Sequence, residues 1–339
     1  MIAILIRDYL EMIDRKRAAA MAEDAVVSLT ITVDRELLRL VFQNEAQAKA
    51  ASPYFAGMLV TTEEEPATKV YYWKDDCAEY IPEGADRGPG VWNFQGSGGR
   101  ALLTVGHSLI AVDERQRRYY VCLQNDAGKE NLLYGHALIV VFMLWQRARG
   151  RSIIHGAAVG REGDGVLIVA RGGKGKSTLS VSCLLGDFDF VSDDYTVLHR
   201  EDDGLIATPL YRTVGLNQDM YRLLQPDMPI VHVDKDRNDK LLLDASACDY
   251  APRLRIKALI VPRVDPEASP ALRRTEPGKA LIPMIHSTVH QMGFARDQEM
   301  VKTLLSLVSG LPVYEFTLGP DIFENRDYLR TALPQLSQY

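Results

Sequence analysis

The sequence lacks closely spaced cysteines and long apolar segments. No two of its four cysteines form a CxxC pair, which argues against a zinc cage or a disulfide framework and suits a reducing cytosol. The longest apolar run, residues 137–145, is about half the length that a membrane-spanning helix needs. The apolar run at residues 2–6 is shorter than the core of a signal peptide. We therefore expect a cytoplasmic protein without a membrane anchor.

Positive charge is also in deficit. The 39 lysines and arginines are outnumbered by 45 aspartates and glutamates, for a net charge of -6. Proteins that grip nucleic acids usually have a basic surface, so nucleic acid is not expected as a partner. The chain has 339 residues, 47% of them hydrophobic. This is ample material for a core, and the length predicts two domains.

The first part of the chain predicts a strand-rich α+β domain over residues 1–128. Apolar residues at helical spacing beside a charged face predict a helix over residues 1–23. Short runs of β-branched and aromatic residues, separated by turn residues, predict strands at 27–33, 69–73 and 119–123. The glycine- and proline-rich stretch 82–99 is predicted to form turns rather than a second phosphate loop, because no apolar strand leads into it.

Residues 129–339 predict an α/β domain, since the pattern becomes strand, loop, helix, strand. A largely buried helix is expected first, at residues 131–149, with Gly150 ending it. Further strands are expected at 153–154, 166–170, 188–192, 258–261 and 313–316. Further helices are expected at 177–185 and 298–309.

A glycine-rich loop between the strand at 166–170 and the following helix predicts a nucleotide site. Glycines let backbone N–H groups curl around a phosphate tail, and the helix N-terminus adds its positive dipole end. Lys176 is expected to reach the β- and γ-phosphates of ATP, and the Ser177 hydroxyl to contact Mg²⁺. Ala170 stands at the first glycine of the GxxxxGK[ST] pattern, which requires a negative φ there. The predicted binding residues are Gly172, Gly173, Lys174, Gly175, Lys176, Ser177 and Thr178. An ordinary strand-to-helix turn without a ligand is the alternative interpretation.

Two adjacent carboxylates follow the next predicted strand. Asp193 and Asp194 come directly after the apolar segment 188–192, at the strand end where α/β proteins bind ligands. Because neighbours on a strand point to opposite sides, the two need not do the same job. One is expected to hold magnesium, for which we choose Asp194 together with Ser177, and the other to accept a proton. His155 ends a short strand just upstream of the loop. It is a candidate site residue because it occurs together with the loop and the aspartate pair.

These motifs resemble the HPr kinase/phosphorylase family, whose nucleotide core is related to phosphoenolpyruvate carboxykinase. That family has His-Gly on one strand, a glycine-rich loop ending in Gly-Lys-Ser, and Asp-Asp on the next strand. His155-Gly156, the loop up to Ser177, and Asp193-Asp194 occur here in the same order. The resemblance covers about residues 150–200. It implies a P-loop core like the C-terminal domain of HPr kinase.

The resemblance also implies roles for single residues. Lys176 binds phosphate, one of Asp193 and Asp194 acts as base, and His155 supports charge near the transferred phosphoryl group. Arg212 and Gly215, three residues apart in the segment 211–216, loosely match a later arginine-glycine segment of the family.

Lys240, a basic residue in a polar loop, is a further candidate for closing over the phosphates. Thr178 and Arg171 stand where HPr kinases carry acidic residues. The sequence is thus nearer to diverged relatives, such as the kinases that phosphorylate a serine of lasso-peptide precursors.

The sequence therefore predicts an ATP- and Mg²⁺-dependent kinase whose acceptor is a hydroxyl group, favouring a serine of a peptide or protein. Two alternatives stay open, a small-molecule kinase of the same fold and a nucleotide-binding regulatory module with little catalysis. A homo-oligomer is compatible with the sequence. His286 and His290 have HxxxH spacing, but no glutamate between them supplies the base of a zinc hydrolase.

Overall fold

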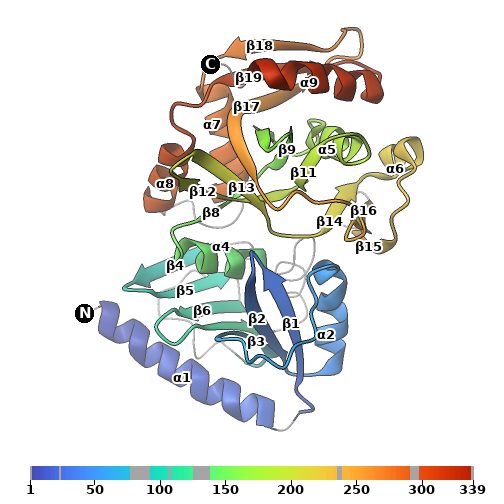
Figure 1. Cartoon of the computed structure of the whole chain (residues 1–339). Helices are drawn as coiled ribbons and strands as arrows, with labels where there is room; N and C mark the ends of the chain where they lie inside the picture. Colours follow the sequence, from blue (N-terminus) through green and yellow to red (C-terminus); the bar gives the residue numbers. More distant parts are fainter. Residues whose placement is uncertain are drawn as a thin grey trace. The chain divides into compact units, whose positions relative to one another are not determined.

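The chain is a mixed α/β protein that divides into two compact units, Met1–Arg149 and Gly150–Tyr339 (Figure 1). The computed structural model describes residues 2–22, 24–76, 92–105, 108–124, 138–234, 239–290 and 298–336. These residues include eight α-helices and three β-sheets. The division follows helix α4 (Ile139–Arg147), whereas the sequence pattern places it at residue 128, outside the described residues.

A seven-stranded mixed sheet forms the centre of the first unit, in the order β1-β2-β3-β7-β6-β5-β4. The β2–β3 and β3–β7 pairs are parallel and the other neighbours are antiparallel. Its strands are β1 (Val27–Val33), β2 (Glu36–Phe42), β3 (Thr68–Lys74), β4 (Trp92–Ser97), β5 (Arg100–Val105), β6 (Ser108–Asp113) and β7 (Arg118–Leu123). The predicted strands at 27–33, 69–73 and 119–123 are confirmed as β1, β3 and β7.

Helix α1 (Ile2–Ala22) confirms the first predicted helix. Its buried residues, among them Leu10 and Ile13, pack against aromatic side chains of the sheet such as Trp73. A short helix α2 (Glu45–Ala51) and a 3-10 turn η1 (Ser52–Phe55) also belong to this unit. Asn44 caps α2, since its side chain accepts a hydrogen bond from the Gln47 amide at 3.1 Å.

The prediction of turns over residues 82–99 is wrong at its end. Residues 92–97 form strand β4, which pairs with β5 from Trp92–Val105 to Ser97–Arg100. The alternation of Trp92 and Phe94 with polar neighbours outweighs the local glycines. Gly98 and Gly99, with φ of 59° and 77°, then make the turn. Residues 82–91 of the predicted loop and 131–137 of the predicted helix lie outside the described residues.

A nine-stranded mixed sheet forms the centre of the second unit. Its main path is β11-β9-β10-β17-β13-β12-β8, with β19 paired to β17 and β18 paired to β19. The strands are β8 (Ser152–His155), β9 (Ala157–Arg161), β10 (Asp164–Ile168), β11 (Asp189–Ser192), β12 (Tyr195–Glu201), β13 (Gly204–Pro209), β17 (Leu254–Val264), β18 (Ala271–Thr275) and β19 (Val313–Leu318). A small antiparallel sheet contains β14 (Thr213–Leu216), β16 (Lys240–Asp244) and β15 (Ile230–Asp234).

Strand directions bring two loops to one edge of the large sheet. β9 is antiparallel to both β10 and β11, so β10 and β11 run the same way. The glycine-rich loop follows β10 and the aspartate pair follows β11. Both loops therefore leave the sheet at the same edge, next to Ala157, where β9 begins.

Helices cover the large sheet on both faces. Val166 and Ile168 of β10 pack in one core cluster with Leu179 of α5 (Lys176–Leu184), to which α9 (Ile322–Leu336) also contributes. Leu167, which points the other way on the strand, is fully buried as well. The remaining helices are α6 (Gln218–Leu224), α7 (Gly278–Ile285), which continues as a π-helical turn η4 (His286–His290), and α8 (Gln298–Val308).

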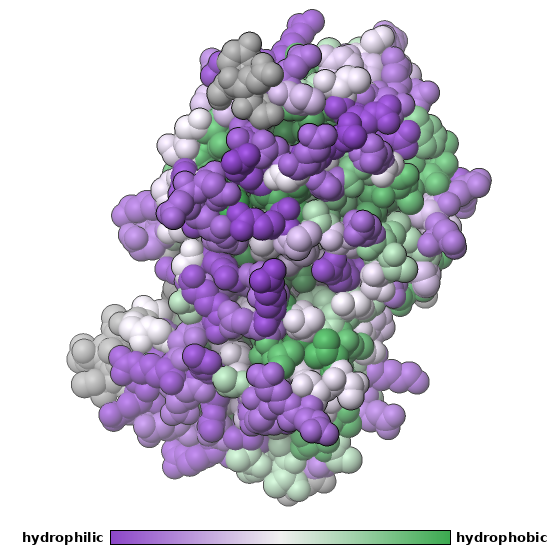
Figure 2. Space-filling model, in the orientation of Figure 1, coloured by the Kyte–Doolittle hydropathy of each residue, from purple (hydrophilic) through white to green (hydrophobic). Residues whose placement is uncertain are grey.

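Hydrophilic side chains predominate on the molecular face shown in Figure 2, with smaller apolar patches between them. This distribution is usual for a chain in which 25% of the residues are charged. None of the helices within the described residues has the length and hydrophobicity needed to cross a membrane.

Candidate functional site

The glycine-rich loop joins the C-terminal end of β10 to the first turn of α5. Gly173 and Gly175 have φ of 76° and 85°, which side-chain-bearing residues rarely adopt. Ala170 is buried and is not among the residues with positive φ. The condition under which alanine can replace the first glycine is therefore met.

Backbone donors converge at this loop. The first helical bond runs from the Leu179 amide to the Gly175 carbonyl at 2.9 Å, so the amides of Lys176, Ser177 and Thr178 precede it in the first turn of α5. Free amides at a helix N-terminus carry partial positive charge and attract anions. Residues 171–174 are exposed, so an anion can reach these donors from solvent. The loop has the geometry of a phosphate site.

Lys176, the first residue of α5, turns inward to the aspartate pair. Its side chain is 7% exposed. Its Nζ donates to the Asp193 carbonyl oxygen at 2.8 Å and to Asp194 Oδ1 at 2.6 Å. The lysine expected to bind phosphate is thus held beside a carboxylate in this structure.

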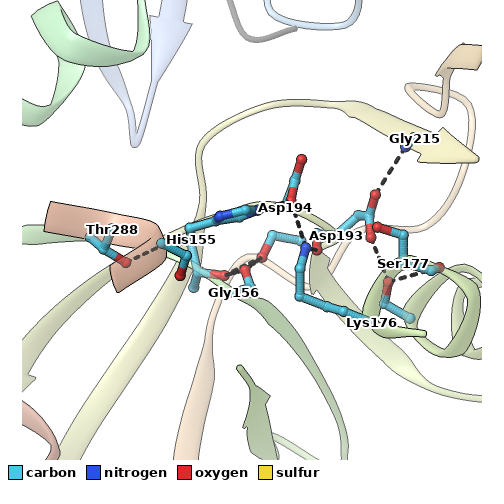
Figure 3. Close-up of polar contacts among 12 residues, drawn as sticks. His155, Gly156, Lys176, Ser177, Asp193, Asp194, Gly215 and Thr288 are labelled. Atoms are coloured by element: carbon cyan, nitrogen blue, oxygen red, sulfur yellow. Dashed lines mark hydrogen bonds and ion pairs between the residues drawn. The ribbon is translucent and has the colours of Figure 1, made fainter. Parts of the chain in front are cut away.

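Asp194 lies among three basic groups, as Figure 3 shows for two of them. Besides Lys176, His155 Nε2 lies 2.6 Å from Oδ1, and Lys240 Nζ lies 3.8 Å from Oδ2. Burial alone would raise the pKa of this carboxyl group, but its contacts with Lys176, His155 and Lys240 outweigh burial and hold the pKa well below its ordinary value. Asp194 is ionised at neutral pH.

His155 is oriented from several sides. Its ring stacks on Tyr195 at 5.1 Å, and its backbone amide donates to Thr288 Oγ1 at 3.0 Å. Because the Asp194 carboxylate only accepts hydrogen bonds, the 2.6 Å contact requires His155 Nε2 to carry the proton. His155 Nδ1 is buried and has no hydrogen-bond partner within the part of the chain that the structure describes. This arrangement favours the tautomer that donates to Asp194.

Asp193 points to different partners from those of Asp194. Its Oδ1 accepts from Ser180 Oγ at 2.7 Å and its Oδ2 accepts from the Gly215 amide at 2.9 Å. Ser180 lies one turn after Lys176 on α5, whereas Gly215 belongs to β14 of the small sheet. Asp193 therefore ties the helix after the loop to the small sheet.

The structure brings five predicted residues together: His155, Lys176, Asp193, Asp194 and Lys240. The other predicted residues of the loop form its exposed part (Gly172, Gly173, Lys174) and the half-buried start of α5 (Gly175, Ser177, Thr178). Arg212 is placed differently, with its guanidinium 4.4 Å from the centre of the Tyr250 ring.

Sequence reasoning missed Ser180, Tyr195 and Thr288. Only Ser180 carried a usable signal, because residues four apart on a helix lie on the same face. Gly215 was noticed only beside Arg212, and its bond to Asp193 could not be foreseen.

The donor set fits magnesium as a partner of bound phosphate rather than as a resident ion. No three His, Cys, Asp or Glu side chains gather as a metal site in the described residues. Mg²⁺ commonly takes one or two protein ligands and completes its shell with phosphate oxygens and water. Ser177, at the start of α5, is suited to that arrangement, whereas the oxygens of Asp194 face Lys176, His155 and Lys240.

The depressed pKa of Asp194 predicts a pH-dependent stability. A carboxyl group with a lowered folded-state pKa stabilises the fold above its unfolded pKa, and this contribution is lost as the pH falls toward the folded pKa. We expect the free energy of unfolding to fall more steeply from about pH 5 to about pH 3 in the wild type than in Asp194→Asn. Urea unfolding at both pH values measures this. A constant difference between the two proteins would contradict the ion pair with Lys176.

Neither protein-family models nor curated proteins match this chain. What the site does is therefore inferred from the loop, the aspartate pair and their cationic neighbours.

Proposed function

We propose that the chain is an ATP- and Mg²⁺-dependent kinase that transfers the γ-phosphoryl group to a hydroxyl acceptor, a serine of a peptide or protein. We also propose that the second unit has an HPr kinase-like fold. The order of its parts supports this, since His155 ends β8, the glycine-rich loop joins β10 to α5, and Asp193-Asp194 follows β11.

One observation carries the proposal. The amides of Lys176, Ser177 and Thr178, which precede the first helical bond of α5, lie at the same sheet edge as a buried carboxylate bound to Lys176. The amides can donate hydrogen bonds to a polyphosphate, and the carboxylate can accept the proton of an attacking hydroxyl. An ordinary strand-to-helix turn needs neither feature.

The groups of the site divide the work of phosphoryl transfer. Lys176 leaves Asp194 for the β- and γ-phosphates, and Asp194 then receives the proton of the acceptor hydroxyl. A bond forms between the acceptor oxygen and the γ-phosphorus, and the bond from that phosphorus to the β–γ bridging oxygen breaks, leaving ADP. His155, through its Nε2–H, keeps Asp194 oriented toward the acceptor. A positioned base typically contributes about 10²- to 10⁴-fold.

Electrostatic stabilisation makes up most of the remaining catalysis in this class of reaction. Magnesium, when bound, would neutralise charge on the phosphate oxygens, and Ser177 would hold it together with those oxygens and water. The loop amides bind the same oxygens from the protein side. Asp193 takes no part in the chemistry, because its two oxygens hold Ser180 and Gly215 in place.

Incubation with γ-labelled ATP and a cell extract tests the proposal. We expect label to enter a peptide or protein, on serine, in the presence of Mg²⁺ only. Label in a metabolite would instead identify a small-molecule kinase of the same fold. Tight ATP binding without any labelled product would favour a nucleotide-dependent regulatory module and contradict the kinase.

A further inference from the structure

Lys240 reaches the site across the backbone of a neighbouring strand. It is the first residue of β16, which pairs with β14 in the register Gly215–Leu242 and Leu216–Leu241. From there its Nζ comes to 3.8 Å from Asp194 Oδ2, the carboxylate oxygen opposite the one bound by Lys176. The Lys240 side chain is 25% exposed, compared with 7% for Lys176. Lys240 is thus the more accessible of the two cations.

The path of the Lys240 side chain depends on Gly215. A Cβ atom at position 215 would lie 2.5 Å from Lys240 Cε and 2.7 Å from Nζ, far inside van der Waals contact. The next nearest atom is Lys240 Cδ, at 3.6 Å. Gly215 is not among the glycines with positive φ, so the backbone itself does not require glycine here. A methyl group at position 215 would instead force the end of the Lys240 side chain to move from its present place.

We propose that Gly215 is a positioning residue, which leaves space for Lys240 to hold its ammonium group over Asp194, where it binds the phosphoryl group during transfer. The inference rests on the proposed kinase function and deepens it. Asp193 fixes the arrangement, because it accepts the Gly215 amide at 2.9 Å and so holds β14 against the site. The small sheet thereby delivers a cation to a site built on the large one.

The placement of Lys240 suits the charge that moves during the reaction. Lys176 serves the β- and γ-phosphates from the side of the loop. Lys240 approaches Asp194 from its other oxygen and is the more exposed of the two lysines. As the γ-phosphorus passes from the bridging oxygen to the acceptor oxygen, negative charge on its three outer oxygens lies between these two cations. Cations placed at a transferring phosphoryl group stabilise it strongly in a site that excludes water.

A double-mutant cycle with Gly215→Ala and Lys240→Ala tests this inference. The first readout is the rate of phosphoryl transfer. The second is the affinity for MgADP, measured with and without tetrafluoroaluminate, an analogue of the phosphoryl group in the transition state. We expect Lys240→Ala to lower kcat by about 10²- to 10³-fold, and to weaken binding of the tetrafluoroaluminate complex far more than binding of MgADP. Gly215→Ala should lower kcat by at least about tenfold, which is roughly the cost of one misplaced contact.

The decisive result is the combination. In a Lys240→Ala background, Gly215→Ala should change either readout by less than about twofold, because the atoms it displaces are gone. Equal losses in both backgrounds, or no loss in the wild-type background, would overturn the inference. Gly278→Ala is the matched control for the added methyl group, since no atom lies within 4 Å of a Cβ at that position. If the wild-type protein binds MgADP and transfers phosphate but the effects of Gly215→Ala and Lys240→Ala are additive, the role of Gly215 is refuted and the kinase proposal stands. A wild-type protein that binds no nucleotide refutes the kinase proposal with it.

Discussion

Lys176→Ala is expected to lower ATP turnover by about 10³-fold or more, the scale on which a cation at the transferring phosphate contributes in this class of reaction. The Lys176 ammonium group is buried and lies against both members of the aspartate pair. Steady-state phosphoryl transfer, with ATP affinity measured separately, gives the effect. Most of the loss should fall on kcat, because the loop amides continue to bind the phosphates.

Folding must be separated from catalysis in this variant. Removing Lys176 leaves Asp194 buried with one cationic partner fewer, which lowers the free energy of unfolding. Breaking a buried pair typically costs about 3–5 kcal/mol, so the variant is assayed below its own unfolding transition. Lys302→Ala serves as the control, because Lys302 is 68% exposed and pairs with Glu299 on the same helix, α8. A Lys176→Ala protein that is folded and retains a tenth of the wild-type rate would refute the assigned role.

Local motifs explain which parts of the site could be predicted. The loop and the aspartate pair each follow an apolar strand, and the ends of nearby strands meet at one edge of a sheet, so sequence order predicted that Lys176 and Asp194 lie together. His155 ends β8, at the other end of the strand order from β11, and its place beside them was predicted only from the family resemblance. The α/β class followed from the same alternation of strands and helices.

Long-range pairing explains what could not be predicted. The small sheet forms because β14 pairs with β16 across the intervening α6 and β15, and this register cannot be read from either strand alone. Consequently the bond from Gly215 to Asp193, and the path of Lys240 over Gly215, were not visible in the sequence. The error at β4 has a different origin, since glycine content was given more weight than the alternation of Trp92 and Phe94.

Substitution by asparagine is expected to lower kcat strongly at Asp194 and only slightly at Asp193. Asp194→Asn should lower kcat by about 10²- to 10⁴-fold, because an amide cannot accept the proton of the acceptor hydroxyl. Asp193→Asn should keep activity within about tenfold of the wild type, since the contacts of Asp193 are those of a hydrogen-bonded anchor rather than a base.

The hydrogen bonds of Ser180 explain why asparagine is tolerated at position 193. Ser180 Oγ lies 2.7 Å from Asp193 Oδ1 and also 3.1 Å from the Ser177 carbonyl oxygen. In Asp193→Asn the amide NH₂ can donate to this hydroxyl, which then donates to the Ser177 carbonyl. The amide oxygen still accepts the Gly215 amide. Asp193→Ala loses both contacts and leaves the buried Gly215 amide without an acceptor, at about 1–3 kcal/mol in stability.

Comparing four proteins therefore assigns the base. Phosphoryl transfer and urea unfolding are measured for the wild type, Asp193→Asn, Asp193→Ala and Asp194→Asn. The expected pattern is a large catalytic loss in Asp194→Asn and a loss of stability in Asp193→Ala, with Asp193→Asn close to the wild type in both. If Asp193→Asn were the inactive variant and Asp194→Asn the active one, the roles would be exchanged. The hydrogen bonds of Asp193 to Ser180 and Gly215 would then have to break when ATP binds, to free a carboxylate oxygen for the acceptor.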